Sequence, residues 1–130
     1  MPTNSKPVVI QIDADPRFAA GAGGAVHFLA ENAGLEHEAA TQLQTATVNA
    51  CLEAFALLLA APLRLEIQLT LYEDRIEIAI SHESGGTGER SADSARRTPA
   101  KAIAGVDRVQ YEQLGKSSVT RLTKYLVRRS

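Results

Sequence analysis

The spacing of hydrophobic residues changes at Pro62, and this change limits the folds that the chain can adopt. Before it, Gln42–Ala60 (QLQTATVNACLEAFALLLA) repeats apolar residues at three- and four-residue steps, which is typical of one buried helix face. After it, apolar and polar residues alternate over Leu63–Leu71 and again over Ile76–Ile80, which predicts two half-buried strands. The polar pair Glu73–Asp74 between the two runs predicts a hairpin turn. The chain must therefore combine a long helix with an antiparallel sheet.

The long helix has small and branched apolar residues at helical spacing, and we expect them to form its buried face. These residues are Leu43, Ala46, Ala50, Ala54, Leu57 and Leu58. Cys51 lies in the same stretch and is the only cysteine, so the chain has no internal disulfide and the thiol is expected to be a small buried group. Asn49 and Glu53 are four residues apart, so we expect them to lie side by side on the helix surface.

The residues before the long helix predict one strand and one further helix. The β-branched run Val8–Ile12 predicts the strand. Asp15 followed by Pro16 is typical of a helix N-cap and first helical position. This helix is predicted to end near Asn32, before Gly34, and the long helix is predicted to begin near Glu36.

The composition of the first helix is unusual. Its apolar side is predicted to carry Phe18, Val26, Phe28 and Leu29. It also contains three glycines, each of which costs about 1 kcal/mol of helix stability relative to alanine. These are Gly21, Gly23 and Gly24. Either close packing against a neighbour or a break in the helix would explain them.

The C-terminal part predicts a loop and a second hairpin. Glu83–Pro99 (ESGGTGERSADSARRTP) is rich in Gly, Ser and charge, which predicts a mobile loop. Ala100–Ala104 is expected to form a helical turn. The hairpin strands are predicted at Val106–Leu114 and Ser118–Val127, with the turn at Gly115–Lys116. The order of elements indicates a single domain over residues 1–130, an α/β two-layer sandwich whose helices cover one face of a mainly antiparallel or mixed sheet.

Charge and hydropathy exclude several classes of partner. The net charge is −1, so the chain has no general attraction to nucleic acid or to an anionic membrane. No apolar run approaches the roughly 20 residues of a membrane-spanning helix, and the first residues lack the apolar core of a signal peptide. We therefore expect a cytoplasmic protein. His27, His37 and His82 together with Cys51 show no metal-ligand spacing, so surface or packed histidines are expected.

Five short fragments are informative when they are taken together. They are IDADPRF at Ile12–Phe18, VNACLEA at Val48–Ala54, LYEDRIEIAISHES at Leu71–Ser84, VDRV at Val106–Val109 and LTKYL at Leu122–Leu126. In this order, and over nearly the whole chain, they resemble the anti-sigma-factor serine kinases of bacteria. The resemblance implies the histidine-kinase-like ATPase (Bergerat) fold. It also implies a sigma factor or an anti-sigma antagonist as the protein partner, and a homodimer as the expected assembly.

The resemblance places two unusual residues at the catalytic positions of the long helix. In the family a Glu acts as the general base and an Asn one helical turn later ligates magnesium; here Asn49 and Glu53 occupy these positions. An amide cannot accept a proton, so Asn49 is expected to be inactive as a base, whereas the Glu53 carboxylate could still bind Mg²⁺. A shift of one turn would make Glu53 the base and put Leu57 at the metal position, so either alignment lacks a required group.

The nucleotide-binding positions implied by the resemblance are altered as well. His82 stands where the family has the Asp that receives the adenine amino group, and Ser84 replaces the first glycine after it, while Gly86 keeps backbone freedom. Arg96–Pro99 replaces the glycine box that closes over the phosphates, and proline has no N–H to donate. Together with Glu53, these residues are predicted to mark a degenerate nucleotide site.

Two functions from different classes follow from the resemblance. The first is a regulatory domain of transcription or signalling that acts by protein binding, with its kinase chemistry degenerate and no cofactor expected. The alternative is an active Mg–ATP-dependent serine-protein kinase with an atypical site. A fragment or partner of a sensor kinase is a third hypothesis.

Overall fold

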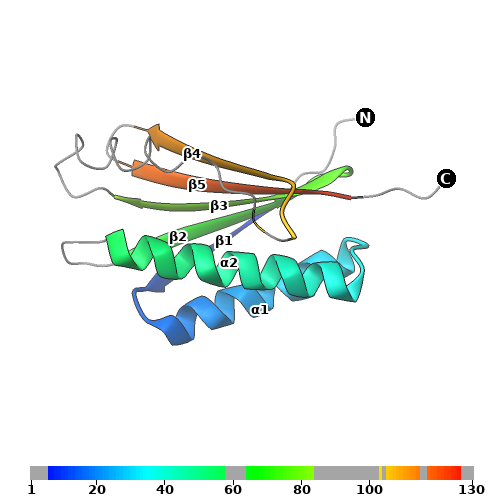
Figure 1. Ribbon diagram of the computed structural model, residues 1–130, viewed down its shortest axis with the longest axis horizontal. Helices are drawn as coiled ribbons and strands as arrows, with labels where there is room; N and C mark the ends of the chain where they lie inside the picture. Colours follow the sequence, from blue (N-terminus) through cyan, green and yellow to red (C-terminus); the bar gives the residue numbers. More distant parts are fainter. Residues whose placement is uncertain (1–5, 58–63, 84–102, 104, 115–116, 127–130) are drawn as a thin grey trace.

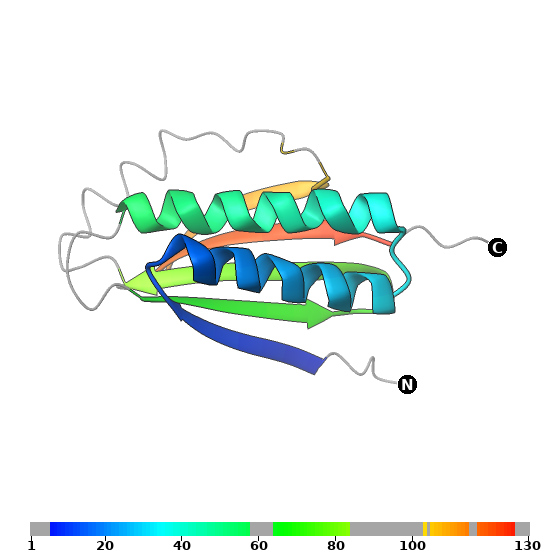
Figure 2. The same cartoon turned by 90° about the horizontal axis from the view of Figure 1, so that it is seen from below.

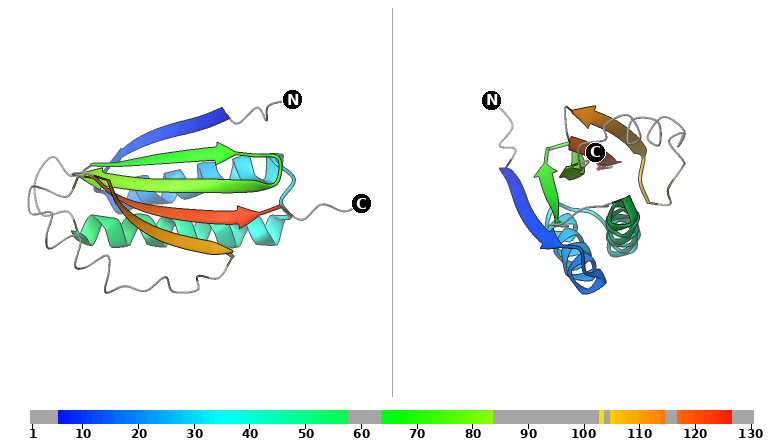
Figure 3. Two further views of the ribbon diagram at one scale, coloured as in Figure 1. Left: turned by 90° about the horizontal axis from the view of Figure 1, so that it is seen from above. Right: turned by 90° about the vertical axis from the view of Figure 1, so that its left-hand side faces the viewer.

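The computed structural model describes residues 6–57, 64–83, 103, 105–114 and 117–126, and these residues form two layers (Figure 1). One layer is a five-stranded sheet, and the other is a pair of helices that lie side by side over one face of that sheet (Figures 2 and 3). In chain order the elements are β1 (Lys6–Asp13), α1 (Pro16–Asn32), α2 (His37–Leu57), β2 (Arg64–Leu71), β3 (Arg75–Glu83), β4 (Arg108–Leu114) and β5 (Ser117–Tyr125).

The sheet has the strand order β1-β2-β3-β5-β4, and each neighbouring pair is antiparallel. The predicted two-layer α/β arrangement, with both helices on one face, is therefore confirmed. A row of apolar side chains crosses all five strands, formed by Val8, Leu69, Ile78, Leu122 and Val109 in cross-strand register. These side chains face the helices, and fully burying each leucine or isoleucine contributes about 1.5–3 kcal/mol.

The predicted elements agree closely with the structure, although several boundaries differ by a few residues; β1, for example, begins at Lys6 and not at Val8. β4 begins at Arg108, two residues after the predicted start, because the chain is still turning at Gly105, whose φ is +84°. Glu83 is the last residue of β3 and not the first residue of a loop. The rest of the predicted loop, most of the turn Ala100–Ala104 and the hairpin turn Gly115–Lys116 lie outside the described residues.

The prediction for the buried side of α1 was wrong for both of its phenylalanines. Phe18 is 47 % exposed and Phe28 is 65 % exposed. Val26 is buried as predicted, and the rest of the buried stripe consists of small residues, Ala19, Ala22, Gly23 and Ala30. Two apolar stripes compete on this helix, and the one with small side chains faces inward because α1 packs very close to α2. The larger stripe is left in solvent.

The sheet face turned away from the helices is polar. Arg75 Nε lies 2.8 Å from Glu77 Oε2, and Arg121 bridges Glu77 at 3.6 Å and Glu112 at 3.2 Å across three strands. These charged side chains are 20–35 % exposed, so they are partly buried by one another. Ion pairs near a protein surface typically contribute about 0–1 kcal/mol each, and this face is therefore a charged surface and not a second core. Within the described part of the chain, no helix is sufficiently long and apolar to span a membrane.

Candidate functional site

The predicted catalytic pair lies on the exposed surface of α2. Asn49 and Glu53 are both exposed, as their position one helical turn apart predicts. Glu53 is on the side of α2 that faces β4, since its negative charge affects the pKa of the Tyr111 phenol. Burial raises the pKa of the Tyr111 phenol above its usual value, and the Glu53 charge raises it further because a second negative charge nearby is unfavourable.

His82 occupies the inner face of β3, directly opposite Ser118 of β5, and is buried. The C-terminal ends of β3 and α2 lie at the same end of the molecule (Figures 1 and 2), so His82 and Glu53 both belong to that end. Ser84, Gly86 and the predicted phosphate lid Arg96–Pro99 lie outside the described residues. Of the predicted nucleotide site, the described part of the chain therefore contains Asn49, Glu53 and His82.

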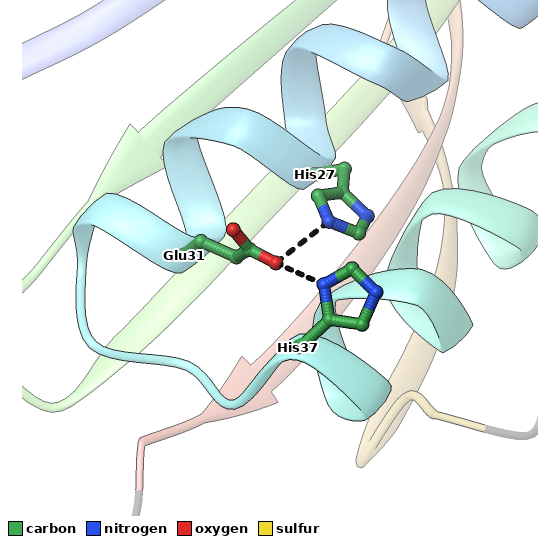
Figure 4. Close-up of side chains that lie close together, drawn as sticks. All are labelled: His27, Glu31 and His37. Atoms are coloured by element: carbon green, nitrogen blue, oxygen red, sulfur yellow. Dashed lines mark hydrogen bonds and ion pairs between the residues drawn. The ribbon is translucent and has the colours of Figure 1, made fainter.

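A second group of polar side chains gathers where α1 meets α2. His27 and Glu31 come from the last turns of α1, and His37 is the first residue of α2. Figure 4 shows that the three side chains point toward one another from the two helices. His27 Nε2 lies 2.8 Å from Glu31 Oε2, and His37 Nδ1 lies 2.5 Å from the same oxygen. Both imidazole rings are therefore within hydrogen-bond distance of the same carboxylate oxygen of Glu31.

Local sequence explains why these three residues meet. His27 and Glu31 are four residues apart and so share one side of α1. Gly34, with φ of +105°, ends the helix in a left-handed conformation that favours glycine, and the chain then reverses. This reversal places His37 beside the end of α1. Its ring packs edge to face against the ring of His27, with a centroid distance of 4.9 Å.

The three side chains differ in burial, and this difference gives the group an inner and an outer side. His27 is 19 % exposed, whereas His37 is 80 % exposed. His27 Nδ1 lies 2.9 Å from Oε1 of Gln44, a residue of α2. The hydrogen bonds from His37 and, second, from His27 hold the pKa of the Glu31 carboxyl below its usual value.

Histidine spacing in the sequence did not predict this group of side chains. His82 and Cys51 lie elsewhere and are buried, in agreement with their expected packed environments. The expectation that His27 and His37 are ordinary surface or packed histidines overlooked that they converge on one carboxylate. A usable signal was present in the sequence: a His–Glu pair at helical spacing, followed by a helix-ending glycine and a histidine at the next helix start.

Models of known protein families and curated protein sequences were compared with this chain, and neither comparison gave a match.

Proposed function

We propose that this chain is a regulatory domain that acts by binding another protein, in the manner of the bacterial anti-sigma kinases that its sequence resembles, and that it does so without phosphoryl transfer. The order of elements and the placement of both helices on one face of an antiparallel sheet support the histidine-kinase-like ATPase fold for it. Fold alone does not determine function, and the surface of α1 and the residues of α2 support the proposal further.

The outward surface of α1 is the observation that carries this proposal. Phe18 and Phe28 are large aromatic side chains that remain 47 % and 65 % exposed, although the core offers apolar surroundings. At 100° and 1.5 Å per residue, they fall within roughly a quarter of the helix circumference and are about 15 Å apart along its axis. Exposed aromatic groups that share one stripe are typical of protein-binding surfaces.

The residues between the two phenylalanines favour an elongated apolar partner. Gly21 and Gly24 are exposed, and a Cβ atom on either one would meet nothing within 4 Å. Gly21 falls between the two aromatic side chains and Gly24 lies beside Phe28, so bare backbone adjoins the stripe and lets a partner segment approach closely. Arg17 borders one end and Asn32 the other, so the rim is polar.

The second candidate function, a Mg–ATP-dependent serine kinase, is favoured by one feature. Glu53 is exposed and its carboxylate is a good ligand for a hard cation. Against it stands Asn49, since an amide at the base position cannot take the proton of a substrate hydroxyl. The partner expected for either function is a sigma factor or an anti-sigma antagonist.

Titration calorimetry tests the proposal directly, with purified sigma factors and antagonist proteins of the source cell added to the full chain in the absence of nucleotide. We expect one of them to bind, and Phe28→Ser or Phe18→Ser to weaken that binding at least tenfold. Tyr125→Ser is the matched control, because Tyr125 is a similarly exposed aromatic residue on β5, on the other layer. Equal affinity of the three variants for the partner, or binding only in the presence of Mg–ATP, would contradict the proposal.

A further inference from the structure

We propose that His27, Glu31 and His37 form a binding site for one divalent transition-metal ion, with Zn²⁺ as the best fit. This proposal does not depend on the proposed function. The three residues offer one ligand atom each, two imidazole nitrogens and one carboxylate oxygen, and all three atoms lie within 4.8 Å of one another. Three protein ligands of this type leave a fourth coordination position for water or another small ligand.

The ligand atoms lie within 4.8 Å of one another, so small movements of these side chains would bring them to the spacing that a metal needs. Zinc binds imidazole nitrogen and carboxylate oxygen at about 2.0–2.2 Å, so tetrahedral ligand atoms lie roughly 3.4 Å apart. The contacts of Glu31 Oε2 with the two rings are 2.8 and 2.5 Å, so the carboxylate must withdraw by less than about 1 Å. Glu31 lies on the helix surface and has the freedom to do this.

Gln44 supplies an independent reason to infer a metal ligand. Metal-bound histidines commonly donate their second ring N–H to a fixed oxygen, which holds the ring orientation. Gln44 Oε1 lies 2.9 Å from His27 Nδ1 and is placed to accept that proton. With that proton on Nδ1, the lone pair of His27 Nε2 points at Glu31 Oε2, and either a bound metal ion or a second proton on the ring would join these two acceptor atoms.

The close approach of the two helices holds Gln44 in this position. Its side chain passes beside Gly23 of α1, where an added Cβ atom would lie 3.2 Å from Gln44 Cγ. The glycine therefore leaves room for the glutamine stem, and the glutamine amide orients the histidine. The arrangement of the three ligands and of Gln44 therefore depends on the close contact between α1 and α2.

The chemistry of the ligands indicates the kind of cation. Imidazole favours Zn²⁺, Ni²⁺ and Cu²⁺, whereas Mg²⁺ and Ca²⁺ require more oxygen ligands. The two exposed ligands give solvent access to the ion. A bound metal would connect the end of α1 to the start of α2 across the turn that contains Gly34.

The test uses the full chain, stripped of metal by a chelator and then titrated with ZnCl₂ in a calorimeter. We expect one ion per chain, with at least tenfold weaker binding in His37→Gln and in Glu31→Gln. Both residues are on the surface, so neither variant is expected to disturb folding. Glu38→Gln is the matched control for Glu31→Gln, because it also removes one carboxylate charge. Glu38 lies next to His37 in the first turn of α2 but is not one of the three ligands, so this variant should bind zinc normally.

Two further measurements separate a built site from weak surface binding. Gln44→Leu should weaken zinc binding about tenfold, because the ring of His27 loses its orienting acceptor. Co²⁺ should give visible d–d absorption in the unmodified chain and lose most of it in His37→Gln. Titration curves without saturation, or equal zinc affinity in the unmodified chain and in His37→Gln, would overturn the proposal. The three side chains would then be joined only by hydrogen bonds.

Discussion

Gly23 of α1 faces Val48 of α2 with no room between them for a side chain: a Cβ atom on Gly23 would lie 2.5 Å from Val48 Cγ2. The same atom would lie 3.3 Å from the backbone oxygen of Gln44. Gly21 and Gly24 face open space instead. Of the two explanations that the sequence left open for these glycines, close packing therefore applies to Gly23, and α1 continues unbroken through all three.

Gly23→Ala should lower the free energy of unfolding by up to about 2 kcal/mol. Overpacking a well-filled contact typically costs about 1–3 kcal/mol, and the gain in helix propensity, about 1 kcal/mol, offsets only part of it. Gly21→Ala and Gly24→Ala are matched controls that gain the propensity without the clash, so they should raise stability by up to about 1 kcal/mol. Urea unfolding measures all three variants. Adding Val48→Ala to Gly23→Ala should restore part of the loss, and equal effects of the three glycine substitutions would contradict the packing model.

Sequence periodicity predicted the elements well because each is set by local spacing. β2, β3 and both helices follow directly from alternation, helical repeats and the Asp15 cap. The orientation of α1 was not predictable in this way, because the helix carries two apolar stripes. Which stripe faces inward depends on how closely α2 can approach, and that distance is a property of the assembled structure.

Cys51 should react with alkylating reagents far more slowly than an exposed cysteine. Burial raises the pKa of its thiol to about 11, so the reactive thiolate is scarce at neutral pH, and the side chain is inaccessible as well. The matched control is Ala56→Cys in a Cys51→Ser background, since Ala56 is exposed on the same helix. Iodoacetamide labelling followed by mass spectrometry compares the two rates. In denaturant both cysteines should be labelled quickly, which serves as the control. Similar labelling rates in the folded proteins would show that α2 opens readily.

Asp15 should titrate below its ordinary pKa because Arg17 stabilises its charged form. The guanidinium hydrogen bonds have the largest effect on this pKa, and the Arg17 backbone N–H, 2.9 Å from Asp15 Oδ1, adds to it as the helix cap. A lowered pKa in the folded state means that the group stabilises the fold above the unfolded value near 3.8. This contribution is lost as the pH falls through the lower folded value.

NMR titration of the Asp15 carboxyl carbon checks this prediction. In Arg17→Met the pKa should rise but remain below the ordinary value, since the backbone donor is retained. In Asp15→Asn, which keeps an oxygen to cap the helix, acid unfolding should become less steep below pH ~4. An unchanged pKa in Arg17→Met would show that the ion pair is not formed in solution.

The candidate sites show the same limit of local sequence information. Asn49 and Glu53 were placed correctly on the surface of α2 because helical spacing alone decides it. The electrostatic effect of Glu53 on Tyr111 and the ion pair of His37 with Glu31 each involve residues from different elements. Spacing within one element encodes neither of them, and the second could be anticipated only by combining the end of α1, the turn at Gly34 and the start of α2.

Finally, the isolated protein should not transfer phosphate from ATP to a protein serine. The position that the resemblance assigns to the general base carries the Asn49 amide, which cannot accept a proton, and loss of a general base alone typically costs 10²–10⁴-fold in rate. Phosphoryl transfer also depends on a metal-bound and enclosed triphosphate, and the expected lid sequence ends in Pro99, which has no N–H to donate.

Exchanging the pair, Asn49→Glu with Glu53→Asn, restores the residue types of the family on α2 but leaves the lid and His82 unchanged. We therefore expect this double variant to remain inactive in a labelled-phosphate assay with candidate antagonist proteins, and calorimetry to detect no micromolar Mg–ATP binding in either form. Magnesium-dependent transfer by the unmodified chain would show instead that Glu53 serves a working kinase.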